Sequence, residues 1–171
     1  MIKLLHNPKT KDYCDFKRWV LSPEFAWHYN GASTPDIKNS THTDLPFYTH
    51  TFLGRPESDF YSRVHNPEEV HGVVQILKNI LDCNEVLMNN FVRISVNAVH
   101  PEKEIKSSIP HLDHQFPHGN IVIYLDDSGG STFVEGEEYS PEEDDVIVFT
   151  GEHYMQSPAE NRRVILVATM V

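Results

Sequence analysis

The sequence predicts an α+β protein that is mainly β, with supporting helices in its first half and a sandwich or barrel of short strands in its second half. Two observations predict this class. Apolar residues between 70 and 81 recur with the period of a helix, and after Asn84 the apolar pattern changes to the alternation typical of strands. The strands that follow are short and separated by turn clusters, which is typical of sandwiches and barrels.

The N-terminal part is rich in aromatic residues and prolines, and we expect it to form short strands and loops packed on the main domain. The best strand candidate there is 45–53, and a short helical piece is expected over 58–65. No linker or charge block interrupts the chain. We therefore expect one domain, 1–171, with supporting strands and helices in 1–87 and the β core in 88–171.

The clearest helix begins at Asn66. This residue suits the N-cap, Pro67 suits the first helical position, and Glu69 can complete a capping box. An unbroken apolar stripe then runs from Val70 to Leu81. A helix with such a stripe packs against something flat, and we expect a sheet.

The strands expected after this helix alternate with clusters of turn-forming residues. The expected strands are 91–97, 119–125, 131–135, 146–149 and 163–170. Segment 126–130 predicts a hairpin turn, and 140–145 predicts a second turn.

The composition argues against several classes of protein. The chain of 171 residues has a net charge of −11 and no basic stretch longer than a pair, which disfavours nucleic-acid binding. It contains no signal-like apolar N-terminus and no run of about 20 apolar residues, so we expect no membrane partner. Cys14 and Cys83 lie far apart, which argues against a disulfide scaffold and a cysteine zinc site. A cytoplasmic, reducing location is therefore expected.

Four residues of the β half form a pattern with chemical meaning. His111 and Asp113 lie two apart on an extended segment, so their side chains point to the same side. His153 follows a buried strand 40 residues after Asp113 and could reach the same ion. Two imidazoles and one carboxylate form the facial triad of non-haem Fe(II) oxygenases. Arg163, ten residues further on, suits the far carboxylate of an α-keto acid cosubstrate, which a guanidinium binds bidentately.

Residues 91–171 resemble the Fe(II)/2-oxoglutarate-dependent dioxygenases, particularly the small prolyl-hydroxylase-like members found in viruses and bacteria. The family's motifs occur in order. These are His111-x-Asp113, a tyrosine-leucine-asparagine-like strand at 123–126, a glycine-glycine-x-threonine-like turn at 129–133, Val148-Phe149 leading to His153, and a final strand led by Arg163. The resemblance implies a double-stranded β-helix (jelly-roll, cupin-like) core, with Fe(II) on the His-Asp-His triad and 2-oxoglutarate held by the arginine.

The resemblance also extends to residues around the cosubstrate. It implies that Tyr124 reaches the cosubstrate carboxylate and that Thr132 lines the same pocket. Asp126 departs from the family's frequent asparagine at a turn position. Val167 stands where the family often has a polar residue, and this change can remove one hydrogen bond to the cosubstrate.

The activity implied by the resemblance is that of an oxidoreductase. With Fe(II), O2 and 2-oxoglutarate, such an enzyme hydroxylates an aliphatic C–H bond and releases succinate and CO2. A prolyl residue of a peptide or protein is the leading substrate, and free amino acids, small metabolites and nucleobases stay open. The presence of Asp113 favours hydroxylation, because the related halogenases lack this carboxylate.

Each candidate residue also has a structural interpretation. Tyr124 is alternatively a core tyrosine whose hydroxyl is satisfied locally, and Thr132 an ordinary strand residue. Arg93 and Asn97 share a strand face and either line the substrate side of the pocket or pair with nearby acids. The acidic run within 135–145 is expected to be a solvated rim.

The neighbouring histidines and arginine are expected to lie outside the site. Pro110 and Pro117 bracket the segment that contains His114, so His114 and the nearby His118 are expected in a loop, whereas His65 and His100 are expected to be structural or exposed. Strand alternation sends Arg162 to solvent if Arg163 points inward. The alternative to an enzyme is a non-catalytic, cupin-like module that binds a metal or ligand, but such a module has no need for Arg163.

Overall fold

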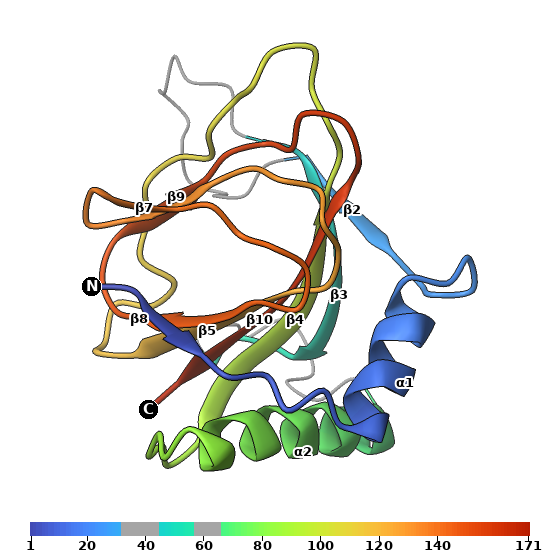
Figure 1. The fold of residues 1–171 in the computed structure, drawn as a ribbon, viewed down its shortest axis with the longest axis vertical. Coiled ribbons are helices and arrows are strands. Elements are labelled where there is room, and N and C mark those ends of the chain that lie inside the picture. The colour runs from blue at the N-terminus through green and yellow to red at the C-terminus, as the bar shows by residue number, and fades with distance from the viewer. Residues whose placement is uncertain (32–44, 57–65) are drawn as a thin grey trace.

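The computed structural model describes residues 1–31, 45–56 and 66–171, and it combines two β-sheets with two helices on the outside (Figure 1). The elements in chain order are β1 (Lys3–Leu5), α1 (Lys11–Val20), β2 (His28–Asn30), β3 (Phe47–Leu53), α2 (Pro67–Cys83), β4 (Phe91–Val99), β5 (Gly119–Tyr124), β6 (Thr132–Val134), β7 (Glu137–Tyr139), β8 (Val146–Phe149), β9 (His153–Met155) and β10 (Arg163–Met170).

The two sheets are antiparallel and enclose the interior of a barrel. The larger sheet has the order β1-β8-β5-β10-β4-β3-β2, and the smaller one has the order β7-β6-β9. Between them lies a buried apolar cluster that includes Val122, Ile165 and Val167 of the larger sheet and Val134 of the smaller one. This mainly β arrangement is a double-stranded β-helix, which confirms the predicted fold class.

Strand β10 is the most buried element of the larger sheet. It lies between β4 and β5, and all eight of its residues are buried. Arg163, Ile165 and Val167 line the interior of the barrel, whereas Val164 and Leu166 belong to the core on the helix side. The alternation therefore turns Arg163 inward, as predicted.

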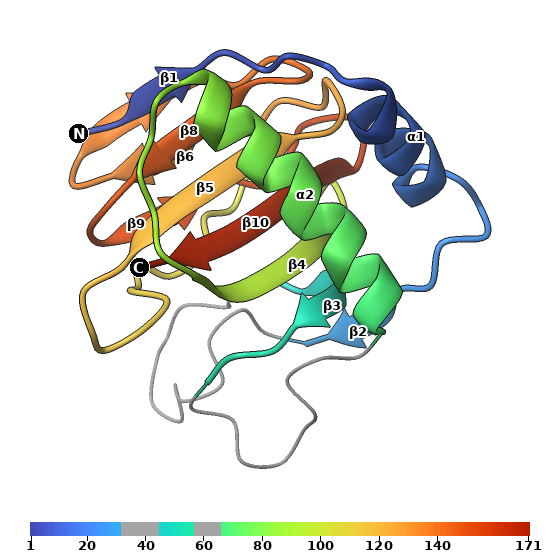
Figure 2. The same cartoon turned by 90° about the horizontal axis from the view of Figure 1, so that it is seen from below.

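Helix α2 crosses the outer face of the larger sheet (Figure 2). Its N-cap is Asn66, whose side chain accepts a hydrogen bond from the backbone N–H of Glu68 and donates one to the Glu69 carboxylate. The buried residues on its inner face are Val73, Ile76, Leu77, Ile80 and Leu81. The predicted helix and its start are thus confirmed. The helical piece expected over 58–65 lies outside the described residues.

Helix α1 lies near the beginning of the chain, where short strands and loops were expected, and it corrects that expectation. Thr10 caps it by accepting a hydrogen bond from the backbone N–H of Tyr13. Tyr13, Phe16 and Val20 form its buried stripe, and charged residues between them obscure the helical period. None of the helices within the described ranges is long and apolar enough to cross a membrane.

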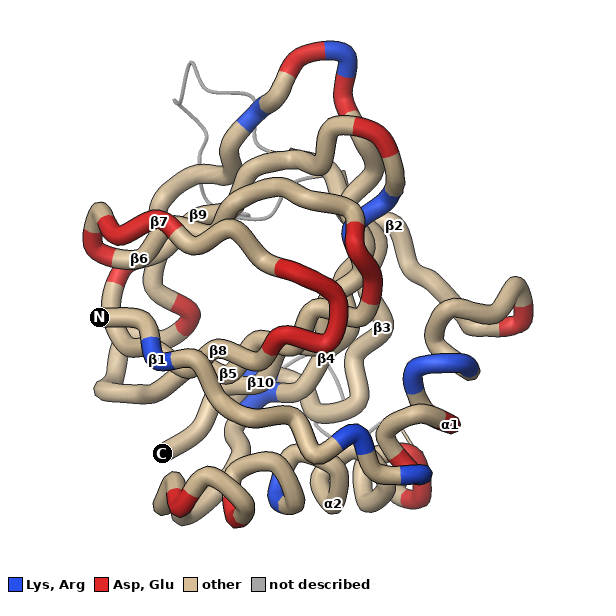
Figure 3. The backbone as a smooth tube through the Cα atoms, viewed as in Figure 1, with Lys and Arg blue, Asp and Glu red and all other residues tan. Residues whose placement is uncertain are grey.

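The acidic segment 135–145 is more structured than the expected solvated rim. Acidic residues do gather on the turns before β7 and β8 (Figure 3). However, Asp144 accepts a 2.6 Å hydrogen bond from the Tyr13 hydroxyl and forms ion pairs with Lys9 and Lys17 at 2.9 and 2.5 Å. These contacts tie the turn before β8 to helix α1.

Candidate functional site

A cavity of about 90 Å³ lies inside the barrel. Its polar lining contains all four residues of the predicted ion and cosubstrate pattern, together with two arginines, an asparagine and a serine. The lining residues are Leu45, Phe47, Arg55, Arg93, Asn97, Val99, Ser108, His111, Asp113, His153, Met155, Arg163, Ile165 and Val167. The barrel therefore brings together residues from β3, β4, β9, β10 and the segment between β4 and β5.

The backbone joins the two predicted histidine ligands directly. His111 and His153 form an isolated antiparallel bridge, in which each backbone N–H donates to the other residue's carbonyl at 3.0 Å. Their ring centroids are 4.7 Å apart. In both residues Nδ1 lies next to a backbone carbonyl, that of Ile109 at 2.8 Å and that of Gly151 at 3.2 Å. A carbonyl only accepts, so each Nδ1 carries a proton, and in the neutral form of each ring Nε2 then has a lone pair for a ligand.

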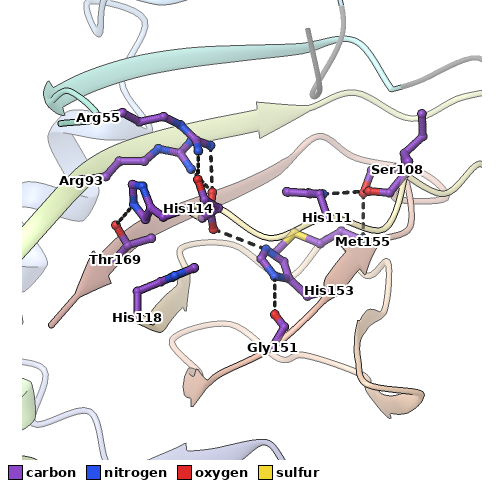
Figure 4. A network of polar contacts seen from close by, with 12 residues as sticks. Arg55, Arg93, Ser108, His111, His114, His118, Gly151, His153, Met155 and Thr169 are labelled. Carbon is purple, nitrogen blue, oxygen red and sulfur yellow. Dashed lines mark hydrogen bonds and ion pairs between the residues drawn. The ribbon is translucent and has the colours of Figure 1, made fainter. Parts of the chain in front are cut away.

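Asp113 is buried beside these histidines, and the guanidinium groups of Arg55 and Arg93 bind one of its oxygens. Figure 4 shows these two arginines side by side and pointing in the same direction. Oδ1 of Asp113 accepts hydrogen bonds from Arg93 at 2.5 Å and from Arg55 at 2.9 Å. Arg55 also donates to the backbone carbonyl of Asp113. The second oxygen, Oδ2, lies 3.5 Å from Nε2 of His153.

The charges around the site shift the pKa values of two predicted ligands. Burial disfavours the Asp113 anion, but Arg93, His153 and Arg55 outweigh this effect, so its pKa lies below the ordinary value. Burial lowers the pKa of His153, and this effect exceeds the opposing attraction of Asp113. Both shifts favour the forms that bind a metal, namely a carboxylate and a neutral imidazole.

Arg163 is among the most buried side chains of the protein, with 1% of its surface exposed. Its Nη1 donates to the backbone carbonyls of Gly130 at 3.1 Å and Gln156 at 2.5 Å, while Nε has no partner among the described residues. Burial lowers its pKa to about 10, so the guanidinium is charged at neutral pH. The charge of Asp126 and the Tyr124 side chain act on this guanidinium electrostatically. No carboxylate of the described residues forms an ion pair with it, and a buried cation of this kind suits an anionic ligand.

Tyr124 and Thr132 lie close to each other at a 2.6 Å distance between their hydroxyl oxygens, and both are buried. Burial raises the pKa of Tyr124 to about 12, and the tyrosine also interacts electrostatically with Arg163. Neither residue is part of the cavity lining. Their mutual contact is the local satisfaction expected of a core tyrosine.

Gly130 has a role that goes beyond the expected turn. It adopts a φ of +85°, and a Cβ at this position would lie 2.8 Å from Nη1 of Arg163 and 2.8 Å from the Gln156 carbonyl. The absence of a side chain at this glycine is therefore needed for the arginine to occupy its position.

The remaining candidates have structural partners. His114 is buried, with Nε2 at 2.7 Å from the Thr169 hydroxyl, and its ring stacks on Phe116. His118 packs edge-on to His114 and, like it, is not part of the cavity lining. Thr49 donates a 2.7 Å hydrogen bond to the Asn97 side chain.

Two further expectations concern positions away from the cavity. His100 is exposed and lies edge-on to Tyr48, as expected, whereas His65 is outside the described residues. Arg162 does not simply extend into solvent, because its guanidinium lies 5.9 Å from the centre of the Trp27 ring. This distance is compatible with a cation–π contact.

The donor set fits a metal ion, although the side chains are not arranged as a complete metal site. Within the three described stretches, no group of three or more His, Cys, Asp or Glu residues is arranged to hold an ion. Oδ2 of Asp113 and Nε2 of His153 are nevertheless 3.5 Å apart. Adjacent donors about 2.1 Å from a six-coordinate ion lie roughly 3 Å from each other, so these two donors are already close to the separation that an ion requires.

Comparison with solved structures shows that the fold is shared with 2-oxoglutarate-Fe(II) oxygenases. An oxidoreductase of the 2OG-Fe(II) oxygenase family from Burkholderia pseudomallei matches with a TM-score of 0.61 and 15% identity, over 92% of this chain and 76% of that one. A prolyl hydroxylase from Trichoplax adhaerens, in complex with a peptide fragment of the hypoxia inducible factor oxygen degradation domain, matches with a TM-score of 0.61 and 11% identity, over 99% and 82%. No protein-family model matches the sequence, and no curated protein matches it significantly.

Proposed function

We propose that this protein is an Fe(II)- and 2-oxoglutarate-dependent dioxygenase that hydroxylates an aliphatic C–H bond. The observation that carries the proposal is the convergence of His111, Asp113 and His153 on one cavity with the buried guanidinium of Arg163. A cupin-like binding module would explain the first three residues. It would not explain why the cavity also contains the buried cation of Arg163, which forms no ion pair with a described carboxylate.

The proposed metal ligands are Nε2 of His111, Nε2 of His153 and Oδ2 of Asp113. The protonated Nδ1 atoms of both histidines donate to backbone carbonyls, and these bonds fix the ring orientations. When bound, Fe(II) and 2-oxoglutarate would supply the oxidative chemistry that inserts one atom of O2 into the substrate, with succinate and CO2 as coproducts.

Arg163 is proposed to bind the carboxylate of 2-oxoglutarate that lies away from the metal. The Gly130 and Gln156 carbonyls orient this guanidinium from one side through Nη1, and within the described part of the chain Nε has no hydrogen-bond partner. Tyr124 lies outside the cavity lining, and it would act on the same carboxylate indirectly, through its electrostatic interaction with Arg163. Apolar residues of the cavity wall, such as Ile165 and Val167, would exclude water and strengthen this ionic contact.

The proposed substrate is a prolyl residue of a peptide or protein. This finer assignment has only the similarity in fold to a peptide-bound prolyl hydroxylase as support. Arg93 and Asn97 line the cavity, where a substrate could contact them.

The experiment that tests the function is an anaerobic titration of the Fe(II)-loaded protein with 2-oxoglutarate, followed by visible absorption. We expect a metal-to-ligand charge-transfer band in the wild type, its loss in Asp113→Ala, and a requirement for much more 2-oxoglutarate in Arg163→Ala. Arg162→Ala is the matched control, and it should behave like the wild type. If the folded, iron-bound wild type gives no band, the proposal is wrong. Succinate release with proline-containing peptides then tests the substrate.

A further inference from the structure

The two oxygens of the Asp113 carboxylate have different surroundings. Oδ1 accepts hydrogen bonds from the Arg93 and Arg55 guanidinium groups, at 2.5 and 2.9 Å. Oδ2 has neither of these bonds and lies 3.5 Å from Nε2 of His153. The side chain of Asp113 is only 2% exposed, so water does not compete for either oxygen to a significant degree.

Arg93 is held more rigidly than an ordinary surface arginine. It belongs to β4, where it is paired in register with Thr169 of the central strand β10. Its side chain is 15% exposed, whereas that of Arg55 is 38% exposed. Arg55 follows β3 and also donates to the backbone carbonyl of Asp113, so it holds the main chain as well as the carboxylate. In the described residues, Arg93 hydrogen-bonds to the carboxylate of Asp113 but not to its main chain.

We propose that Arg93 is a positioning residue that binds Oδ1 of Asp113 and thereby presents Oδ2 to the metal ion between the two imidazoles. This inference rests on the proposed metal site. A free carboxylate can rotate and can bind a metal through one or both oxygens. A strong charge-assisted hydrogen bond at Oδ1 removes this freedom and favours binding through a single oxygen. Groups that orient metal ligands in this way typically change metal affinity 10- to 100-fold when they are removed.

The direction in which metal affinity changes when Arg93 is replaced distinguishes a positioning role from a purely electrostatic one. A guanidinium near a cation repels it, so if Arg93 acted only as a nearby charge, its removal would tighten metal binding. If Arg93 positions Asp113, its removal weakens metal binding despite the loss of repulsion. Replacement by lysine keeps the charge and loses the planar fork. A charge effect therefore predicts unchanged binding in Arg93→Lys, whereas positioning predicts weaker binding.

The test is a titration of the metal-free protein with Co²⁺, without 2-oxoglutarate or O2, followed by the visible d–d bands of the ion and by calorimetry. The proteins compared are the wild type, Arg93→Gln, Arg93→Lys and Arg18→Gln. Arg18 is a matched control for the charge change, because it lies on the outer helix α1 and its side chain is 76% exposed. Thermal unfolding of the metal-free proteins verifies that each variant is folded.

We expect Arg93→Gln to raise the dissociation constant of Co²⁺ by about 10- to 100-fold and to alter its d–d spectrum. Arg93→Lys should show a smaller loss of affinity, and Arg18→Gln should match the wild type. If Arg93→Gln does not fold, the charge-conserving Arg93→Lys decides the question alone. Unchanged or tighter binding in the folded variants would overturn the role of Arg93 while leaving the metal site intact. Failure of the wild type to bind Co²⁺ would instead overturn the proposed metal site itself.

Discussion

His111 and His153 hydrogen-bond to each other through both of their backbone amides. The distance between their imidazoles therefore depends on main-chain pairing as well as on side-chain packing. The bridge also connects the segment between β4 and β5 to the start of β9 in the smaller sheet. Because this bridge joins the two backbones, a shift of β9 or of the segment that carries His111 should move both histidines together.

Replacement of Arg163 by lysine should weaken 2-oxoglutarate binding about 10- to 100-fold. The physical reason is that lysine keeps a positive charge but loses the fork that binds a carboxylate bidentately, and such charged hydrogen bonds contribute about 1.5–3 kcal/mol. The measurement is calorimetric titration of the metal-loaded protein under anaerobic conditions. Arg162→Lys should leave the affinity unchanged. Equal affinities of wild type and Arg163→Lys would show that Arg163 does not bind the cosubstrate.

Gly130→Ala should reduce both stability and 2-oxoglutarate affinity. The new Cβ would contact Nη1 of Arg163 at 2.8 Å, and a φ of +85° strains any side chain by about 1–2 kcal/mol. Gly129→Ala is the control, since Gly129 has a similar φ of +70° but no atom within 4 Å of the added Cβ. Urea unfolding should detect strain in both variants. Only Gly130→Ala should lose cosubstrate affinity, and the same loss in Gly129→Ala would contradict the proposed contact.

Tyr124→Phe and Thr132→Val should be less destabilising together than the sum of the single variants. Each single variant leaves one buried hydroxyl without its 2.6 Å partner, which costs about 1–3 kcal/mol. The double variant leaves neither hydroxyl, so part of this penalty disappears. A double-mutant cycle by urea denaturation measures the difference. Strictly additive effects would mean that the two hydroxyls do not interact.

Asp144→Asn should destabilise the protein by about 1–2 kcal/mol near neutral pH. Burial disfavours the charge of Asp144, but hydrogen bonds from Lys17, Tyr13 and Lys9 lower its pKa below the ordinary value. A carboxyl with a lowered pKa stabilises the folded state above its unfolded pKa of about 4, and this contribution is lost as the pH falls through the folded value.

The measurement for Asp144 is the unfolding free energy of wild type and variant between pH 7 and pH 3. We expect the difference to shrink below about pH 4. Asp15→Asn is a suitable control, because the ion pairs of Asp15 with Lys11 and Arg18 lie on the exposed face of α1 and should contribute nothing measurable. A difference that stays constant with pH would show that the charge of Asp144 is not responsible.

The long and strongly patterned elements could be predicted from the sequence. Helix α2 has a cap, an N1 proline and an apolar stripe, and all of them are local signals. Strand β10 consists almost entirely of apolar residues. The alternation of strand residues predicted that Arg163, rather than Arg162, points to the interior, and the structure has Arg163 in the cavity lining. The grouping of the histidines, Asp113 and Arg163 also followed from their order and spacing.

Features that depend on distant partners could not be predicted. Strands β1, β7 and β9 have three residues each, and they exist because β8 and β6 pair with them. The ion pair of Arg55 with Asp113 could not be predicted either, because it joins two positions that are far apart in the sequence and that no local pattern relates. The sequence left open whether Arg93 lines the substrate side of the pocket or pairs with an acid. Its ion pair with Asp113 depends on how β4 lies relative to the loop that carries Asp113.

The position of β10 in the middle of the larger sheet has a consequence for synthesis of the protein. A nascent chain that has reached only residue 162 contains β4 and β5 but not the strand that joins them. Until 163–170 leave the ribosomal exit tunnel, these strands have unpaired edges that can associate with other chains. We therefore expect the barrel to close only after this stretch emerges, so that chaperones or slow translation before it would affect the yield of folded protein.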